Sequence, residues 1–326
     1  MALGRLSHTA ALLNSGKVLI AGGYGATGYL VSSEMYDPST DEWNSTASMA
    51  LGRVSHTETL LNSGKVLIAG GYGATGYLAS SEIYDPSTSN WSPTTSMARA
   101  RMFHTATLLN SGKVLVAGGA ISTASLDSSE IYDPSIGSWA PTTSMIQARY
   151  SHTAILLKSG KVLVTGGYES TDSLNSSEIY DPSTGQWNST TRMAIARAYH
   201  TATLLNSGNV LVTGGLNASF ILRSSEIYNP STGKWNSTTR MAIARGHHTG
   251  TLLNSGNVLV AGGYGSIGYL NSSEIYDPST EEWNSATNMA IARGYHTATL
   301  LNSGKVLATG GIGSMDYLVS CEIYNS

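Results

Sequence analysis

The chain repeats one pattern every 48 residues. A histidine recurs at this interval, and an arginine stands three residues before each copy, from Arg5 to Arg293. The seven histidines are His8, His56, His104, His152, His200, His248 and His296. A period of this length indicates an array of one module, because each module buries its apolar surface against its neighbours.

Each module is predicted to form four short strands. In the third unit, residues 104–109 (HTATLL) and 128–133 (SSEIYD) alternate, and residues 113–119 (KVLVAGG) form a buried apolar run. A fourth strand contains the tryptophan, as in residues 187–191 (WNSTT) of the next unit. The sequences NSG and DPST separate these runs and have the composition of turns. No segment shows the 3.6-residue period of a helix.

Four-stranded units repeated between four and eight times are typical of a β-propeller. A single four-stranded sheet leaves both faces uncovered, so neighbouring units must cover them. We therefore predict an all-β, seven-bladed β-propeller with four antiparallel strands per blade. The predicted blades are residues 1–48, 49–96, 97–144, 145–192, 193–240, 241–288 and 289–326 of a single domain spanning residues 1–326.

The pattern resembles the kelch repeat. Gly22-Gly23, Tyr36 and Trp43, preceded by Arg5, carry the resemblance, which recurs in phase through the chain. It implies a kelch-type propeller whose strands run outward from the axis in sequence order, and it implies a protein partner, because kelch propellers most often serve as interaction platforms. The family includes a copper oxidase with a Tyr–Cys cofactor. Cys321 is the single cysteine here, and its place in a predicted third strand gives no sign of such a site.

The seventh unit departs from the pattern, because it contains Tyr324 but no tryptophan after it. Residues 1–4 are too short to replace the missing strand. The last blade is therefore expected to have three strands and an uncovered edge, which favours pairing with another chain. Further sequence or a partner chain could cover this edge. Self-association through it is a structural alternative for the function.

Composition argues against several classes of partner. The net charge is −3 and 12% of the residues are charged, so no basic surface for nucleic acid or an anionic membrane is expected. A single cysteine excludes an internal disulfide framework and a cysteine-rich metal site. No apolar stretch reaches the length of a membrane span, and no signal peptide is visible. Cytoplasmic and extracellular locations both stay open.

Two stretches differ between the repeats: the residues between Gly-Gly and SSE, and the two residues between the arginine and the histidine. In antiparallel blades both stretches emerge on one face, and the near-invariant turns emerge on the other. Recognition commonly lies on loops carried by a rigid scaffold. We predict that the variable face binds a protein partner or a glycan through Phe103, Tyr150, Tyr199, His247, Tyr295, Tyr24, Tyr72, Tyr168, Tyr264 and Phe220.

The repeated histidines are interpreted as scaffold. His248 is expected to join Arg245 and Glu274 in a hydrogen-bonded ring that ties strands and blades together, because buried arginine and glutamate normally occur paired. A seven-histidine ring that binds a metal or an anion is the alternative. His247 lies in the variable pair of residues and is a candidate ligand contact near the channel mouth.

An enzymatic or small-ligand site at the channel mouth is the competing hypothesis. Glu58 replaces the alanine or glycine of the other units in the innermost strand, and it is expected to point into the channel or to meet Arg53 or Arg101. With His104, these residues form the candidate channel cluster. No GxSxG, HExxH, Walker or CxxC motif is present. The sequence therefore favours a non-catalytic recognition module, with no cofactor and no metal predicted.

Overall fold

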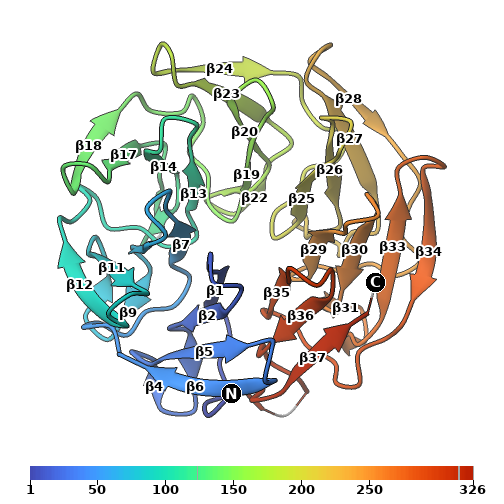
Figure 1. Ribbon diagram of the computed structural model, residues 1–326. Helices are drawn as coiled ribbons and strands as arrows, with labels where there is room; N and C mark the ends of the chain where they lie inside the picture. The colour runs from blue at the N-terminus through green and yellow to red at the C-terminus, as the bar shows by residue number, and fades with distance from the viewer. Residues whose placement is uncertain (123, 315, 326) are drawn as a thin grey trace.

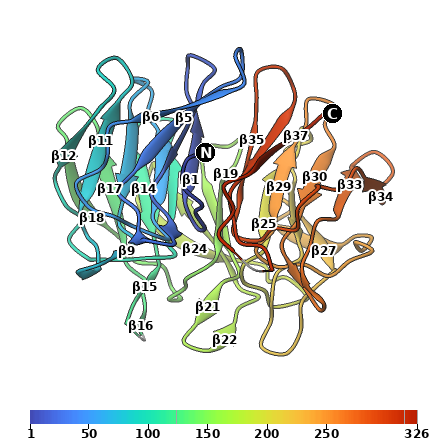
Figure 2. The ribbon, with the colours of Figure 1, turned by 90° about the horizontal axis from the view of Figure 1, so that it is seen from below.

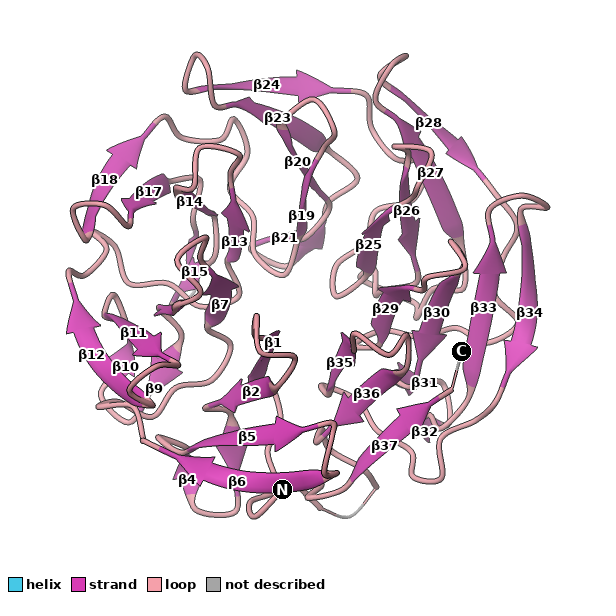
Figure 3. Ribbon diagram, viewed as in Figure 1, coloured by secondary structure: helices cyan, strands magenta, loops and turns pink. Residues whose placement is uncertain are grey.

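The computed structural model describes residues 1–122, 124–314 and 316–325, which form a closed ring of blades (Figure 1). Within these ranges all regular elements are β-strands (Figure 3), and no helix is long and apolar enough to cross a membrane. Six blades have four antiparallel strands, and the seventh has three. The predicted seven-bladed propeller with a three-stranded last blade is confirmed.

The strands of each blade follow one another outward from the axis (Figure 1). The innermost strands are β1 (Thr9–Leu12), β7 (Thr57–Leu60), β13 (Thr105–Leu108), β19 (Thr153–Leu156), β25 (Thr201–Leu204), β29 (Thr249–Leu252) and β35 (Thr297–Leu300). The second strands are β2 (Val18–Ala21), β8 (Val66–Ala69), β14 (Val114–Ala117), β20 (Val162–Thr165), β26 (Val210–Thr213), β30 (Val258–Ala261) and β36 (Val306–Thr309). The third strands are β5 (Ser33–Asp37), β11 (Ser81–Asp85), β17 (Ser129–Asp133), β23 (Ser177–Asp181), β27 (Ser225–Asn229), β33 (Ser273–Asp277) and β37 (Cys321–Tyr324). The outermost strands are β6 (Glu42–Thr46), β12 (Asn90–Thr94), β18 (Ser138–Thr142), β24 (Gln186–Thr190), β28 (Lys234–Ser237) and β34 (Glu282–Ala286).

The Gly-Gly pair after each second strand is required by close packing against the segments that lead into the same blade and the next one. In blade four, β20 is buried at all of its positions and is followed by Gly166 and Gly167. Both glycines have positive φ, +65° and +95°. A Cβ on Gly167 would lie 2.6 Å from the carbonyl oxygen of Tyr150, so only glycine fits this turn.

The core consists of apolar clusters between successive blades. Between blades three and four, Leu115, Val162, Val164, Tyr180 and Trp187 pack together. Tyr180 and Trp187 face each other across β23 and β24, and their ring centroids lie 5.1 Å apart. The fixed spacing of tyrosine and tryptophan thus places both rings in the blade interface.

The N-terminal residues close the ring against blade seven. The carbonyl of Arg5 accepts a hydrogen bond from the Gly311 N–H at 2.8 Å. His8 lies 3.1 Å from the Thr297 hydroxyl, and β1 contacts β35. Closure also involves the outer strand of blade seven, because the indole N–H of Trp43 donates to the sulfur of Cys321 at 3.3 Å. This strand, β37, has no fourth strand beside it in the described part of the chain.

The variable stretches contain short hairpins that the sequence analysis did not predict. These are β3 (Tyr24–Gly25) with β4 (Gly28–Tyr29), β9 (Tyr72–Gly73) with β10 (Gly76–Tyr77), β15 (Ala120–Ile121) with β16 (Ala124–Ser125), β21 (Tyr168–Glu169) with β22 (Asp172–Ser173), and β31 (Tyr264–Gly265) with β32 (Gly268–Tyr269). In blades five and seven a single bridge replaces the hairpin. Figure 2 shows β15–β16 and β21–β22 projecting from the same side of the ring, which we call the variable face.

Candidate functional site

The repeated arginines are buried inside the scaffold. Arg245 is fully buried and forms an ion pair with Glu274, at 2.9 Å. Its guanidinium also donates to the carbonyls of Gly262 and Ser272. Glu274 in turn accepts hydrogen bonds from the backbone of Ala242 and Ile243, in the segment that enters the blade. Each pair therefore anchors the connection between two blades to the third strand.

The histidine ring differs from the expected arrangement. His248 is not hydrogen-bonded to Arg245 or Glu274; its Nε2 lies 3.1 Å from the hydroxyl of Thr201 in the preceding blade. The same contact recurs around the ring, ending with His8 and Thr297. The physical reason is that the Arg245 guanidinium and the Glu274 carboxylate already form an ion pair with each other. The packing of adjacent blades brings the threonine of one blade beside the histidine of the next.

The histidines are held neutral by their surroundings. Burial lowers the pKa of His248 well below its usual value, and the Arg245 charge lowers it further. For His104 the same two causes lower the pKa to about 3. Among the described residues, no group of three or more His, Cys, Asp or Glu side chains is arranged to hold a metal ion.

The channel cluster predicted from the sequence is not assembled. Arg53 and Arg101 are each committed to an ion pair at 2.8 Å, with Glu82 and Glu130 respectively. His104 lies 2.9 Å from the Thr57 hydroxyl. Three of the four candidates are thus engaged in repeated scaffold contacts.

The position of Glu58 also differs from the prediction that it points into the channel or meets Arg53 or Arg101. It meets neither arginine, because both are already paired, and its side chain lies between blades one and two near Thr9. Both carboxylate oxygens are buried, and neither has a hydrogen-bond partner among the described residues. Burial raises the pKa of Glu58 to about 8, although the Thr9 hydroxyl opposes the shift.

The centre of the variable face is built on a ring of backbone hydrogen bonds. We call the second residue between each arginine and histidine the slot residue; the seven are Ser7, Ser55, Phe103, Ser151, Tyr199, His247 and Tyr295. All have left-handed backbone, with φ from 48° to 56°. Each slot N–H donates to the slot carbonyl of the preceding blade, and Ser7 closes the circle onto Tyr295 at 3.0 Å. Slot side chains and the histidines behind them line an open depression of about 310 Å³ at the channel mouth.

Six predicted face residues come together around this depression. We call them the aromatic arc: Phe103, Tyr150, Tyr168, Tyr199, His247 and Tyr295. His247 lies between two tyrosine rings, with centroid distances of 4.0 Å to both Tyr199 and Tyr295. The Tyr295 hydroxyl is 3.1 Å from His247 Nε2. Burial lowers the pKa of His247 to about 4 and raises that of Tyr295 to about 12, so both rings are neutral near pH 7.

A second set of rings follows the hairpins further from the axis. This tyrosine ladder runs over blades seven, one and two and consists of Tyr317, Tyr24, Tyr29, Tyr72 and Tyr77. Neighbouring rings meet edge to face at 4.9–5.9 Å, an orientation that aromatic quadrupoles favour. Tyr264 and Phe220 belong to neither set and are 42% and 71% exposed.

The ten residues named from the sequence do not include Tyr29, Tyr77 or Tyr317, although all three lie in the variable stretches after Gly-Gly. Tyr29 and Tyr77 pair with Tyr24 and Tyr72 across the hairpins. The repeated string YGATGY could have predicted these pairs, because two tyrosines that flank a glycine-containing turn are expected to be cross-strand partners. Together, the arc and ladder provide neutral aromatic surface with hydroxyl groups, which suits recognition of apolar and hydrogen-bonding groups rather than charged ones.

Comparison with known proteins agrees with this architecture. A family model described as the KLHDC2/KLHL20/DRC7 Kelch-repeats domain matches residues 103–311, and an Attractin/LZTR1 beta-propeller model matches residues 2–172. No curated protein matches the chain by sequence.

Solved structures share the fold at low sequence identity. One is a novel fungal alcohol oxidase of the AA5 family in complex with copper. The match covers 95% of this chain and 70% of the oxidase chain, with a TM-score of 0.78 and 17% sequence identity. Another is the structure of YjhT, for which the match covers 88% of this chain and 98% of the YjhT chain, with a TM-score of 0.67 and 16% sequence identity. These likenesses concern the propeller fold alone.

Proposed function

The chain belongs to the kelch-repeat β-propeller family, and we propose that it is a non-catalytic recognition module that binds a protein partner on its variable face. Kelch propellers are typically protein-interaction modules. The observation that carries the proposal is the placement of the aromatic arc and the tyrosine ladder on the one face where the repeats have diverged.

The spread of these rings favours a protein over a small ligand. The arc surrounds the channel mouth, whereas the ladder extends over the hairpins of blades seven, one and two. Phe220 and Ile267 add apolar side chains that are 71% and 92% exposed. Tyrosine and exposed apolar groups around a rigid centre are typical of protein interfaces. A glycan would use the same tyrosines and is the second ligand to test.

The enzymatic alternative lacks a comparable assembly. Arg53, Arg101 and His104 are occupied inside the scaffold, and Glu58 lies apart from them between two blades. The third hypothesis, self-association through the edge of blade seven, involves a different part of the molecule. It predicts concentration-dependent oligomers, which analytical ultracentrifugation would detect.

The other repeats indicate which residues can replace the aromatic side chains of the variable face without disturbing the fold. Blades one, two and four carry serine in the slot with the same left-handed backbone, so serine fits there without new strain. The face variant combines Phe103→Ser, Tyr199→Ser, His247→Ser and Tyr295→Ser with Tyr150→Val, since blade two has Val54 at that position. The control variant, Ile136→Thr with Lys158→Asn, changes the opposite face to the residues of the other repeats.

Immobilised parent, face variant and control variant are compared for proteins retained from extracts and for binding to a glycan array. The proposal predicts a protein retained by the parent and the control but lost by the face variant, whose folding is checked by circular dichroism. A protein retained equally by all three would place the interface elsewhere. Glycan binding without a retained protein would replace the protein partner with a carbohydrate.

A further inference from the structure

The outermost strands of the complete blades form the rim of the ring (Figure 1). Among the described residues, no strand pairs with the outer edge of any of them. In blade five the Thr238 N–H donates inward to the Ser225 carbonyl at 3.1 Å, so the N–H of the preceding Ser237 points away from the sheet. Free edge groups of this kind favour pairing with another chain, and natural proteins protect them.

Blades two and three protect this position with proline. Pro93 lies opposite Glu82 in β12, and Pro141 lies opposite Glu130 in β18. Proline has no N–H, so it removes the outward donor and leaves the inner ladder intact. The residues in the same register of blades one, four and five are Ser45, Ser189 and Ser237. These serines keep the outward donor.

The blades that lack this proline carry another feature at the same place. Each of the three serines is the middle residue of an Asn-Ser-Thr sequence, which begins at Asn44, Asn188 or Asn236. Asparagine followed two residues later by serine or threonine, with any residue except proline between them, is the acceptor sequence for N-glycosylation. Proline and this acceptor sequence therefore exclude each other, and each of these five blades has one of the two.

The threonine of the acceptor sequence has a role in the scaffold. Thr190 lies 3.0 Å from the Tyr228 hydroxyl of the next blade. Thr142, in a strand with proline, makes the same contact with Tyr180 at 3.0 Å. This contact therefore explains the threonine in both kinds of strand, and it does not explain the asparagine.

The three asparagines of these strands have no such role. Asn44, Asn188 and Asn236 are exposed, and their side-chain amides have no hydrogen-bond partner in the described part of the chain. Blades two and three have Ser92 and Ala140 in this place, so the fold does not require asparagine. The amides are thus free for modification on the rim.

We propose that Asn44, Asn188 and Asn236 carry N-linked glycans that cover the outer edges of blades one, four and five. A bulky hydrated glycan beside the free N–H blocks the approach of a second strand, as the proline does in blades two and three. These sites are separate from the variable face and do not rest on the function proposed above.

The modification is a glycosyl transfer from a lipid-linked oligosaccharide diphosphate. A bond forms between the asparagine side-chain nitrogen and the first sugar carbon, and the bond from that carbon to the diphosphate oxygen breaks. The nitrogen loses one proton, and the lipid diphosphate leaves with the electron pair. The proposal therefore includes passage of the chain through the secretory route, where this donor is available.

Mass spectrometry of the chain purified from the cells that produce it tests the three sites. Enzymatic release of N-linked glycans in water labelled with heavy oxygen converts each glycosylated asparagine into a labelled aspartate. We expect the label at all three positions. Unlabelled asparagine at any of them would overturn the proposal.

Two triple variants, secreted from the same eukaryotic cells as the parent, test the protection of the edges. The serine variant, with Asn44, Asn188 and Asn236 each changed to Ser, copies blade two and loses the glycans. The proline variant, with Ser45, Ser189 and Ser237 each changed to Pro, also loses the glycans but gains the protection of Pro93. Circular dichroism checks the folding of both.

Sedimentation velocity over a range of concentrations compares the three proteins. The serine variant is expected to associate more strongly than the parent as concentration rises, and the proline variant is expected to match the parent. The enzymatically deglycosylated parent is an independent comparison and should behave like the serine variant. Equal association of the parent and its deglycosylated form, or association of a folded proline variant as strong as that of the serine variant, would overturn the proposal.

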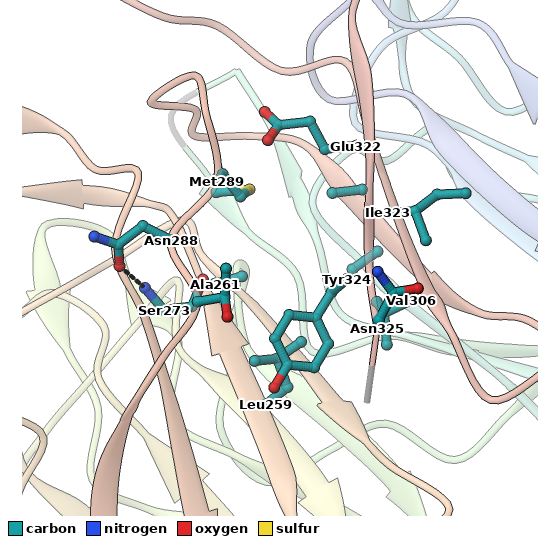
Figure 4. A pocket seen from close by; sticks show the side chains of 13 residues that line it. Leu259, Ala261, Ser273, Asn288, Met289, Val306, Glu322, Ile323, Tyr324 and Asn325 are labelled. Atoms are coloured by element: carbon teal, nitrogen blue, oxygen red, sulfur yellow. Dashed lines mark hydrogen bonds between the residues drawn. The ribbon is translucent and has the colours of Figure 1, made fainter.

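The edge of blade seven does not affect this comparison. Its strand β37 has no fourth strand beside it in the described part of the chain, and Tyr324 of this strand lines one pocket with Leu259 of blade six (Figure 4). Since the substitutions lie in blades one, four and five, any association through β37 is common to the parent and both variants.

Discussion

Glu58 is an acid whose carboxylate the fold buries near the Thr9 hydroxyl, and its titration should make stability depend on pH. Its oxygens lie between blades one and two, and burial raises its pKa from 4.5 to about 8. The folded state therefore binds the proton more tightly than the unfolded state does. By linkage, the free energy of unfolding is highest below pH 4.5 and falls as the pH rises toward 8.

The magnitude follows from the size of the shift. One pKa unit corresponds to about 1.4 kcal/mol, so the ionisation of Glu58 should lower the free energy of unfolding by about 1 kcal/mol at pH 5 and about 4 kcal/mol at pH 8. Glu58→Gln keeps the shape of the side chain but does not titrate. The variant should therefore gain about 3 kcal/mol relative to the parent between pH 5 and pH 8.

Urea denaturation of the parent and Glu58→Gln at pH 5, 6.5 and 8 measures this difference. Glu42→Gln, at an exposed position in β6, serves as the control and should run parallel to the parent. Parallel pH profiles for the parent and Glu58→Gln would refute the reasoning, because they would mean that Glu58 titrates alike in the folded and unfolded states.

Other substitutions test the scaffold and the face. Trp187→Ala should lower the free energy of unfolding by about 3–5 kcal/mol, because it leaves a cavity in the apolar cluster between blades three and four; an unchanged urea midpoint would contradict this packing. Arg101→Gln should cost about 3–5 kcal/mol by leaving Glu130 buried and unpaired, whereas Lys113→Gln, which breaks an exposed pair with Asp133, should cost less than about 1 kcal/mol in the same assay. Tyr199→Ser should cost about 1 kcal/mol or less and weaken partner capture; a much larger loss of stability would make Tyr199 a core residue.

The repeat made the blades predictable, including the incomplete one. The period and the turn residues located all of the large strands, because alternation and apolar runs repeat with no insertion. The absence of a tryptophan after Tyr324 indicated an uncovered edge.

Contacts around the axis could not be read from the sequence. Each histidine is followed directly by a threonine, yet His248 bonds to Thr201 of the preceding blade, which is a consequence of how the ring closes. The packing of His247 between Tyr199 and Tyr295 has the same origin, because the ring brings slot residues 48 positions apart in the sequence side by side at the channel mouth. Comparing repeats identified the variable positions, whereas the ring geometry determined which of them touch.

Site-specific photocrosslinking tests the recognition face most directly. Phe220, on the variable face, and Ile136, in the turn between β17 and β18 on the opposite face, are 71% and 73% exposed, so a photoreactive phenylalanine at either position is equally accessible. The account predicts a covalent adduct with a partner protein in extracts from position 220 and none from position 136. An adduct from position 136 alone would place recognition on the opposite face and contradict the account.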